Sequence, residues 1–120
     1  MAQTLKVQAS IRNDTDGGFV GSQSFTVTTT GNGSWSSKAS VSSAAEEEWT
    51  IDTQIGDAGF CVIRNLDATN YLQVGFATGV YYLRIKAGQC AAFPLEPGVA
   101  SLFLKANTAA VVAQVYVAEA

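Results

Sequence analysis

The sequence predicts an all-β domain, an antiparallel β-sandwich with a jelly-roll-like order of strands. Apolar and polar residues alternate along most of the chain, which is the two-residue period of half-buried strands. Turn-forming residues recur about every 8–12 residues, the spacing expected of sandwiches and barrels. No apolar pattern of helical period reaches a useful length. The connections are short, which favours antiparallel pairing because parallel neighbours need long crossovers.

The chain of 120 residues is long enough for one domain and too short for two ordinary ones. We therefore expect residues 1–120 to form a single β-sandwich domain, with residues 1–56 as a less compact N-terminal part. The shift in composition near Asp57 then marks a change of sheet or of sheet edge within that domain.

The first two strands lie in this less compact part. Alternate apolar residues share one face of the first strand: Leu5, Val7, Ala9 and Ile11. Residues 13–18, which follow, are Asn, Asp, Thr and Gly, the residue types that favour a turn. Phe25 and Val27 begin the second strand, and residues 31–33 form the next turn.

The segments that follow are polar or mixed. Residues 34–43 are rich in Ser, and we expect them to form an edge strand or a loosely held arm. The polar region of residues 22–43 is expected to extend onto neighbouring subunits or the shell. Their apolar face consists of Trp35, Ala39 and Val41. Residues 44–48 are compatible with one helical turn, after which the alternation resumes. The apolar side of that later segment is Trp49, Ile51 and Ile55.

The second half is denser in apolar residues. Its strands are expected at residues 60–64, 71–76, 80–86, 89–95, 101–105 and 111–117. Turns separate them, including a tight hairpin connection at Thr78-Gly79. The last strand is apolar on both sides, which is typical of a strand buried on both faces. Because few charges lie nearby, we expect one of its faces to contact another subunit.

Composition limits the class of partner. The net charge is −3 and the seven Lys and Arg residues are scattered, so the chain lacks the concentrated basic face that nucleic acids require. No stretch approaches the ~20 apolar residues that span a bilayer, and the start has no apolar signal-peptide core. We expect no nucleic acid or membrane partner and assembly in the cytoplasm. Charged residues make up only 14%, which favours a chain packed against neighbours.

Catalysis is not expected. The sequence contains no His, which removes the commonest general base, the Ser–His and Cys–His pairs and most zinc sites. We therefore expect no enzyme activity, no catalytic residue, no cofactor and no metal site. Cys61 and Cys90 are expected to be reduced and mostly buried thiols, with a disulfide between neighbouring strands as the alternative.

Two clusters of acidic residues make a cation site the alternative to the expectation that the chain binds no metal. Asp14-x-Asp16-Gly17 resembles the start of an EF-hand loop but lacks the later bidentate Glu, so a plain turn is favoured. The second cluster is Glu46, Glu47 and Glu48. It is expected on a solvated loop or helix start, with a cation site or an acidic docking point as the alternative.

Aromatic and C-terminal residues supply the candidate contact surface. Tyr81 and Tyr82 are adjacent, so they point to opposite faces of one strand, and exposed tyrosines often anchor protein contacts. We expect the oligomer or capsid contact to involve Trp35, Tyr81, Val111, Val115, Tyr116 and Val117. The alternatives are that the aromatic residues form the core or a sugar-binding platform. The platform would consist of Trp35, Trp49, Tyr71, Tyr81, Tyr82 and Tyr116.

A series of landmarks runs from about Gly59 to Glu119, half of the chain. They are Asn65-Leu66-Asp67, Thr69-Asn70-Tyr71-Leu72-x-Val74-Gly75, Leu83-x-Ile85-x-Ala87-Gly88, Ala91-x-Phe93-Pro94-Leu95 and Leu104-x-Ala106-Asn107-Thr108-Ala109-Ala110-Val111. Their order resembles a group of small virion structural proteins of tailed bacteriophages. The resemblance leaves residues 1–56 outside and includes no catalytic signature.

The resemblance implies a capsid decoration (cement) protein. Such a protein is a β-sandwich that assembles with copies of itself, often as a homotrimer, and binds the major capsid protein on the surface of the virion head. It stabilises the head by bridging capsomers, and many modest contacts become strong together. No individual binding residue carries over. The alternatives are a receptor- or carbohydrate-binding module of a tail fibre, or a head–tail connector or tail component.

Overall fold

The computed structural model describes residues 4–12, 20–29, 31 and 33–120. The expected turn at residues 13–18, with Asp14 and Asp16, lies outside these residues. The described ranges contain ten strands and one short 3₁₀ helix, η1 (Thr53–Ile55). The strands are β1 (Thr4–Arg12), β2 (Val20–Thr28), β3 (Ser34–Val41), β4 (Glu47–Thr50), β5 (Ala58–Asn65), β6 (Leu72–Gly75), β7 (Leu83–Ile85), β8 (Cys90–Pro94), β9 (Ser101–Ala106) and β10 (Val111–Glu119).

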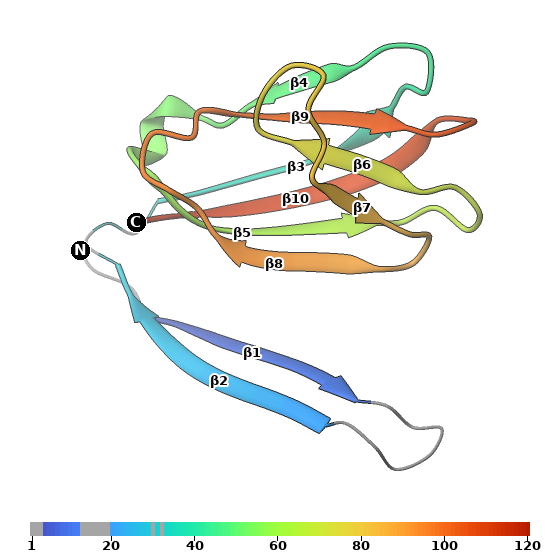
Figure 1. Cartoon of the computed structure of the whole chain (residues 1–120). Helices are drawn as coiled ribbons and strands as arrows, with labels where there is room; N and C mark the ends of the chain where they lie inside the picture. Colours follow the sequence, from blue (N-terminus) through green and yellow to red (C-terminus); the bar gives the residue numbers. More distant parts are fainter. Residues whose placement is uncertain (1–3, 13–19, 30, 32) are drawn as a thin grey trace.

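Strands β3 to β10 form a sandwich of two antiparallel sheets (Figure 1). In the described part of the chain, one sheet has the order β3-β10-β5-β8 and the other the order β4-β9-β6-β7. Only the β6–β7 connection stays within a sheet, and every other connection from β3 onward crosses to the opposite sheet. This alternation, with the first and last strands paired, is the jelly-roll arrangement. The prediction of an antiparallel, jelly-roll-like sandwich is confirmed.

The core lies between the two sheets and follows the two-residue period of the strands. Val115 and Val117 of β10 lie opposite Ile63 and Cys61 of β5, and all four side chains are fully buried. The facing sheet contributes Leu72, Val74, Leu102 and Leu104, which are also fully buried. Because the inner faces of both sheets are apolar, the burial of these side chains between the sheets stabilises the sandwich.

Strands β1 and β2 form a separate two-stranded sheet, the hairpin, paired from Thr4↔Thr28 to Arg12↔Val20. Figure 1 shows the hairpin outside the sandwich, on the side of the β3-β10-β5-β8 sheet. The radius of gyration is 15.4 Å, above the value of about 13.6 Å expected for a compact chain of this length. The part outside the sandwich therefore ends before Ser34, whereas the sequence placed the limit of the less compact part at residue 56.

Two local predictions need correction. Residues 44–48 form bends followed by the start of β4, and no helical turn. The Glu47 carboxylate accepts a hydrogen bond from the backbone N–H of Ser42 at 2.5 Å, which fixes an open loop in place of a helix. The strand expected at residues 80–86 covers only β7, because Val80 belongs to the turn through its bridge to Ala77.

The edge position expected for residues 34–43 is confirmed, since β3 is the outermost strand of its sheet. Its partner is the central strand β10, in a register that places Trp35 opposite Val117. Among the residues that the structure describes, no helix has the length and apolar character needed to cross a membrane.

Candidate interaction surfaces

Part of the series of sequence landmarks builds a hydrogen-bonded loop after β5. The Asn65 side chain is 1% exposed and donates to the backbone carbonyls of Asn70 and Ile85, each at 2.9 Å. It also accepts from the backbone N–H of Asp67 at 2.9 Å. The Asp67 carboxylate accepts from the N–H groups of Asn70 and Thr69, and these bonds lower the pKa of Asp67. These polar groups are engaged in holding the connection between the sheets.

A second set of bonds ties this loop to the turn after β9. The Asn107 side chain accepts from the backbone N–H of Tyr71 at 2.8 Å. Thr108 donates to the Asn70 side chain at 3.1 Å. The guanidinium of Arg84 lies 4.3 Å from the centre of the Tyr71 ring, within the range of a cation–π contact. The landmark residues therefore have a structural role at one end of the sandwich.

The first candidate surface is the loop between β6 and β7, which a carboxylate anchors. The Tyr81 hydroxyl donates to Glu46 Oε1 at 2.5 Å, and the backbone N–H of Gly79 donates to the same oxygen at 2.7 Å. The bond from Tyr81 is the main cause that lowers the pKa of Glu46. The same bond raises the pKa of Tyr81 to about 12. The loop is thus fixed to the residue that precedes β4.

Because Tyr81 turns toward Glu46, its neighbour Tyr82 points outward and is 81% exposed. Phe76 and Val80 of the same loop are 38% and 39% exposed. We call these three residues, Phe76, Val80 and Tyr82, the loop surface. Phe76 also packs edge-on against Phe93, with ring centres 5.9 Å apart. Figure 1 shows this loop rising past β9 toward β4, on the side of the sandwich away from the hairpin.

The second candidate surface is the outer face of the β3-β10-β5-β8 sheet together with the hairpin that lies over it. The register places Tyr116 opposite Val62, and Ala118 opposite Phe60, on the side that faces away from the core. Phe25 of β2 packs edge-on against Phe60, with ring centres 6.5 Å apart. We call this assembly of hairpin and sheet face the hairpin surface.

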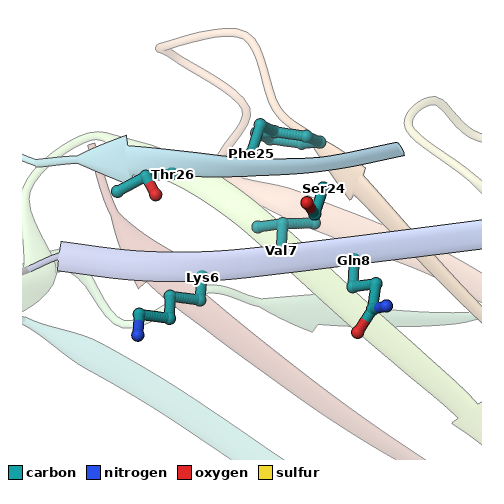
Figure 2. Close-up of a pocket in the computed structure, with 6 residues that line it drawn as sticks. All are labelled: Lys6, Val7, Gln8, Ser24, Phe25 and Thr26. Carbon is teal, nitrogen blue, oxygen red and sulfur yellow. The ribbon is translucent and has the colours of Figure 1, made fainter. Parts of the chain in front are cut away.

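The hairpin covers this face incompletely. A cavity of about 250 Å³ separates residues 5–8 of β1 from the sheet residues Phe60, Val62, Ala92, Tyr116 and Ala118. A hollow of about 310 Å³ lies within the hairpin itself. Figure 2 shows the side chains that line this hollow, with Val7 lying between the two strands and with Lys6 and Gln8 pointing away from Phe25. Phe25 remains 43% exposed and Tyr116 44% exposed.

The six residues expected to form the contact surface lie in different places. Val111, Val115 and Val117 have no exposed surface and are core residues, because β10 turns its odd-numbered side inward. Trp35 is half-buried and packs against the same core. Tyr81 is bonded to Glu46, and only Tyr116 belongs to the hairpin surface. The accessible apolar residues of β10 are Tyr116 and Val112, the latter 40% exposed.

Sequence reasoning missed most of the residues on these surfaces. Phe25, Phe60, Val62, Phe76, Val80 and Val112 were not assigned to a contact. A signal existed for Val112, since it shares the two-residue period of Tyr116. No signal existed for Phe60, whose role depends on a hairpin more than thirty residues earlier.

The aromatic residues do not gather into one sugar-binding platform. Trp35 and Trp49 pack against the core, Tyr71 lies under Arg84, and Tyr116 and Tyr82 belong to different surfaces. The acidic residues are dispersed too, and the described residues contain no group of three His, Cys, Asp or Glu placed to hold a metal ion. Glu46 and Glu47 act as hydrogen-bond acceptors for nearby loops.

The two cysteines are unpaired and differ in environment. Cys61 is buried in the core, and burial raises the pKa of its thiol to about 12. Cys90 is exposed, which corrects the expectation that both thiols are mostly buried. The register explains why no disulfide joins them, since Cys90 lies opposite Arg64 and Cys61 lies opposite Phe93.

Comparison with known proteins gives no family assignment. The chain matches no protein-family model, and no curated protein sequence matches it. A proposal for the function of the chain therefore rests on the geometry of the two surfaces together with the sequence landmarks of residues 59–119.

Proposed function

We propose that the chain is a structural virion protein of a tailed bacteriophage, a capsid decoration (cement) protein that stabilises the head by bridging capsomers. The observation that carries the proposal is the exposure of apolar side chains on two separate surfaces, the loop surface and the hairpin surface. Single exposed apolar residues are ordinary on a protein surface, but grouped ones mark sites of contact. A protein that bridges subunits needs at least two such sites.

The loop surface is suited to contact the shell. Tyr82 projects from a loop whose position is fixed by two hydrogen bonds to Glu46. A tyrosine presented in this way loses little conformational freedom on binding, and such residues dominate many protein contacts. We assign the loop surface to the major capsid protein and the hairpin surface to contacts among copies of the chain, with a trimer favoured by the resemblance.

This role requires no chemistry from the protein. Each copy buries surface at a seam between shell subunits, and the shell presents the same seam many times. Contacts that are modest one by one become strong when several are engaged at a high effective concentration. The proposed location is the outer surface of the virion head.

The test uses heads of the phage that encodes this chain, prepared from a strain without the gene. Purified protein is added back, and the ratio of bound chain to major capsid protein is measured together with the temperature at which the heads lose their DNA. We expect saturable binding at a fixed ratio and a higher release temperature. Failure of the full chain to bind such heads, or its absence from purified wild-type particles, would contradict the proposal.

A matched pair of variants locates the contact. Tyr82→Ser removes the exposed ring and is expected to weaken binding to heads at least tenfold. Tyr82→Phe keeps the ring and is expected to bind within twofold of the wild type. If the wild type and both variants bind heads equally well, the loop surface takes no part in the contact with the head.

One observation favours a second candidate, a carbohydrate- or receptor-binding module of a tail fibre. The Tyr82 ring is 81% exposed, and an exposed aromatic face is a common stacking partner for sugar rings. This function predicts binding to a defined glycan on an array, with loss of binding in Tyr82→Ser. Decoration predicts no glycan signal.

A further inference from the structure

The hairpin needs a partner surface. An isolated two-stranded ribbon is marginally stable in water, and β1 and β2 each have nine residues. Neither strand pairs with any strand of the sandwich in the described sheets, so each leaves one edge open. The stability of the hairpin therefore depends on packing against an apolar face.

Packing within a single chain satisfies this need only in part. Phe25 contacts Phe60 yet remains 43% exposed, and Leu5 and Val7 are half-buried over the cavity of about 250 Å³. Ile11, farther along the same face, is 65% exposed. The apolar side of the hairpin thus extends beyond what its own sheet covers.

The connection between hairpin and sandwich is anchored on the sandwich side. Gly33 and Glu119 pair through two bonds, Gly33 N–H to the Glu119 carboxylate at 2.8 Å and Glu119 N–H to the Gly33 carbonyl at 2.9 Å. The N–H of Gly31 donates to the Ala120 carbonyl at 3.3 Å. These bonds join the segment that follows β2 to the end of β10.

We propose that the β1–β2 hairpin of one copy packs on the outer face of the β3-β10-β5-β8 sheet of a second copy. The second copy is the occupant because its sheet presents the same Phe60, Val62 and Tyr116 that the hairpin contacts within one chain. Exchange of an identical element between copies preserves each contact and so has little cost.

The inference rests on the contact between copies that the proposed function assigns to the hairpin surface, but its test uses the purified chain alone, so exchange can fail while binding to heads holds. The first measurement is the mass of the purified full-length protein in solution by light scattering. We expect a multiple of the 12.6 kDa chain. A mass of one chain at 100 μM would overturn the proposal.

The second measurement asks which surfaces meet. Two differently tagged chains, both carrying Cys90→Ser, are co-expressed, one with Val7→Cys and the other with Val62→Cys. These two positions line opposite walls of the same cavity, so a short bismaleimide is expected to join the two tags. A control pair replaces Val62→Cys by Glu48→Cys, on the other sheet, and is expected to give no product. An oligomer that yields no cross-link between the Val7 and Val62 tags would overturn the exchange.

A pair of matched substitutions completes the test. Phe25→Ser removes an exposed ring from the hairpin, and Tyr82→Ser removes an exposed ring from the loop surface. We expect Phe25→Ser to raise the concentration at which half of the protein dissociates at least tenfold, with an unchanged circular dichroism spectrum. Tyr82→Ser is expected to leave dissociation unchanged. An equal effect of the two would contradict the assignment of the hairpin to the contact between copies.

Discussion

The carboxylate of Glu119 accepts a hydrogen bond from the backbone N–H of Gly33 at 2.8 Å, and the Gly33 carbonyl accepts one in return from the Glu119 N–H at 2.9 Å. The end of the last strand thereby holds the start of the sandwich at the point where the hairpin joins it. A Cβ at Gly33 would lie 2.6 Å from Glu119 Oε2 and 3.1 Å from the Cα of Ile55. A side chain at position 33 would therefore displace the Glu119 carboxylate and crowd the backbone of Ile55.

The Glu119 contact predicts a measurable loss of stability. In Glu119→Ala the partly buried N–H of Gly33 loses its acceptor, which costs about 1–2 kcal/mol because hydrogen bonds to charged groups are among the stronger ones. Glu119→Gln keeps an oxygen acceptor and is expected to lose less than half of that amount. Urea unfolding measures both, with a lower midpoint and an unchanged slope. Equal midpoints for the wild type and Glu119→Ala would contradict this account of the junction.

Asn65 is the second point at which one side chain holds several segments. Removing it in Asn65→Ala leaves the buried carbonyl of Ile85 and the N–H of Asp67 without the partners that they have in the structure. We expect a loss of about 2–4 kcal/mol, because unpaired buried polar groups bear their full desolvation penalty. The control is Asn70→Ala, whose side chain makes only exposed bonds, and a loss under about 1 kcal/mol is expected. Similar losses in the two variants would argue against a special role for Asn65.

The bond between Tyr81 and Glu46 predicts a titration. The pKa of Tyr81 is raised to about 12, and in Glu46→Gln it is expected to fall toward the ordinary value of about 10. Phenolate absorbance at 295 nm follows the change, with Tyr81→Phe identifying which tyrosine contributes. A late-titrating tyrosine that persists in Glu46→Gln would show that another group raises the pKa.

The same bond gives the loop a pH dependence. The hydrogen bond from Tyr81 holds the pKa of Glu46 in the folded state below its ordinary value of 4.5, so the carboxylate stabilises the fold above about pH 4.5 and the contribution is lost as the pH falls through the lower folded pKa. For Tyr81 the folded pKa is raised, so its contribution is present below about pH 10 and lost as the pH rises toward 12. The difference in thermal midpoint between the wild type and Glu46→Gln is therefore expected to be largest between about pH 4.5 and about pH 10. A difference that stays constant down to pH 2 would contradict the assignment.

The two thiols are expected to react at different rates. Cys90 is exposed, whereas Cys61 is buried with a pKa raised to about 12, and the thiolate is the reactive form. A thiol reagent at pH 8 should modify one cysteine per chain quickly and the second only after unfolding. Cys90→Ser is expected to remove the fast phase. A fast phase that remains in Cys90→Ser would place Cys61 outside the core.

The alternation of residue types was sufficient to predict the strands and their class. The strands expected at residues 60–64, 89–95, 101–105 and 111–117 overlap β5, β8, β9 and β10, because a half-buried strand imposes a two-residue period. Thr78-Gly79 indicated the β6–β7 hairpin, which the structure shows. The other pairings could not be predicted, because short connections within a sheet and between sheets have similar lengths.

The candidate surface was harder to predict than the fold, and β10 shows why. Both sides of this strand are apolar. The two-residue alternation of side chains divides them into two sets, but it does not show which set faces the core. One set is Val111, Val115 and Val117, and the other is Val112 and Tyr116. The answer comes from the register with β5, where Ile63 and Cys61 lie opposite Val115 and Val117. The helical turn predicted at residues 44–48 was wrong for another reason. Ser42 donates a hydrogen bond to Glu47 and Gly79 donates one to Glu46. These bonds outweigh the weak helical preference of the segment.

The most direct test of two-surface bridging is hydrogen exchange of the full chain bound to heads, compared with the free protein. Bridging predicts slower amide exchange on heads in residues 76–82, while residues 4–12 and 20–28 are protected to the same degree in both states because copies of the chain already cover them. Exchange in residues 76–82 that is the same on and off the heads, or a hairpin that exchanges freely in both states, would contradict the account.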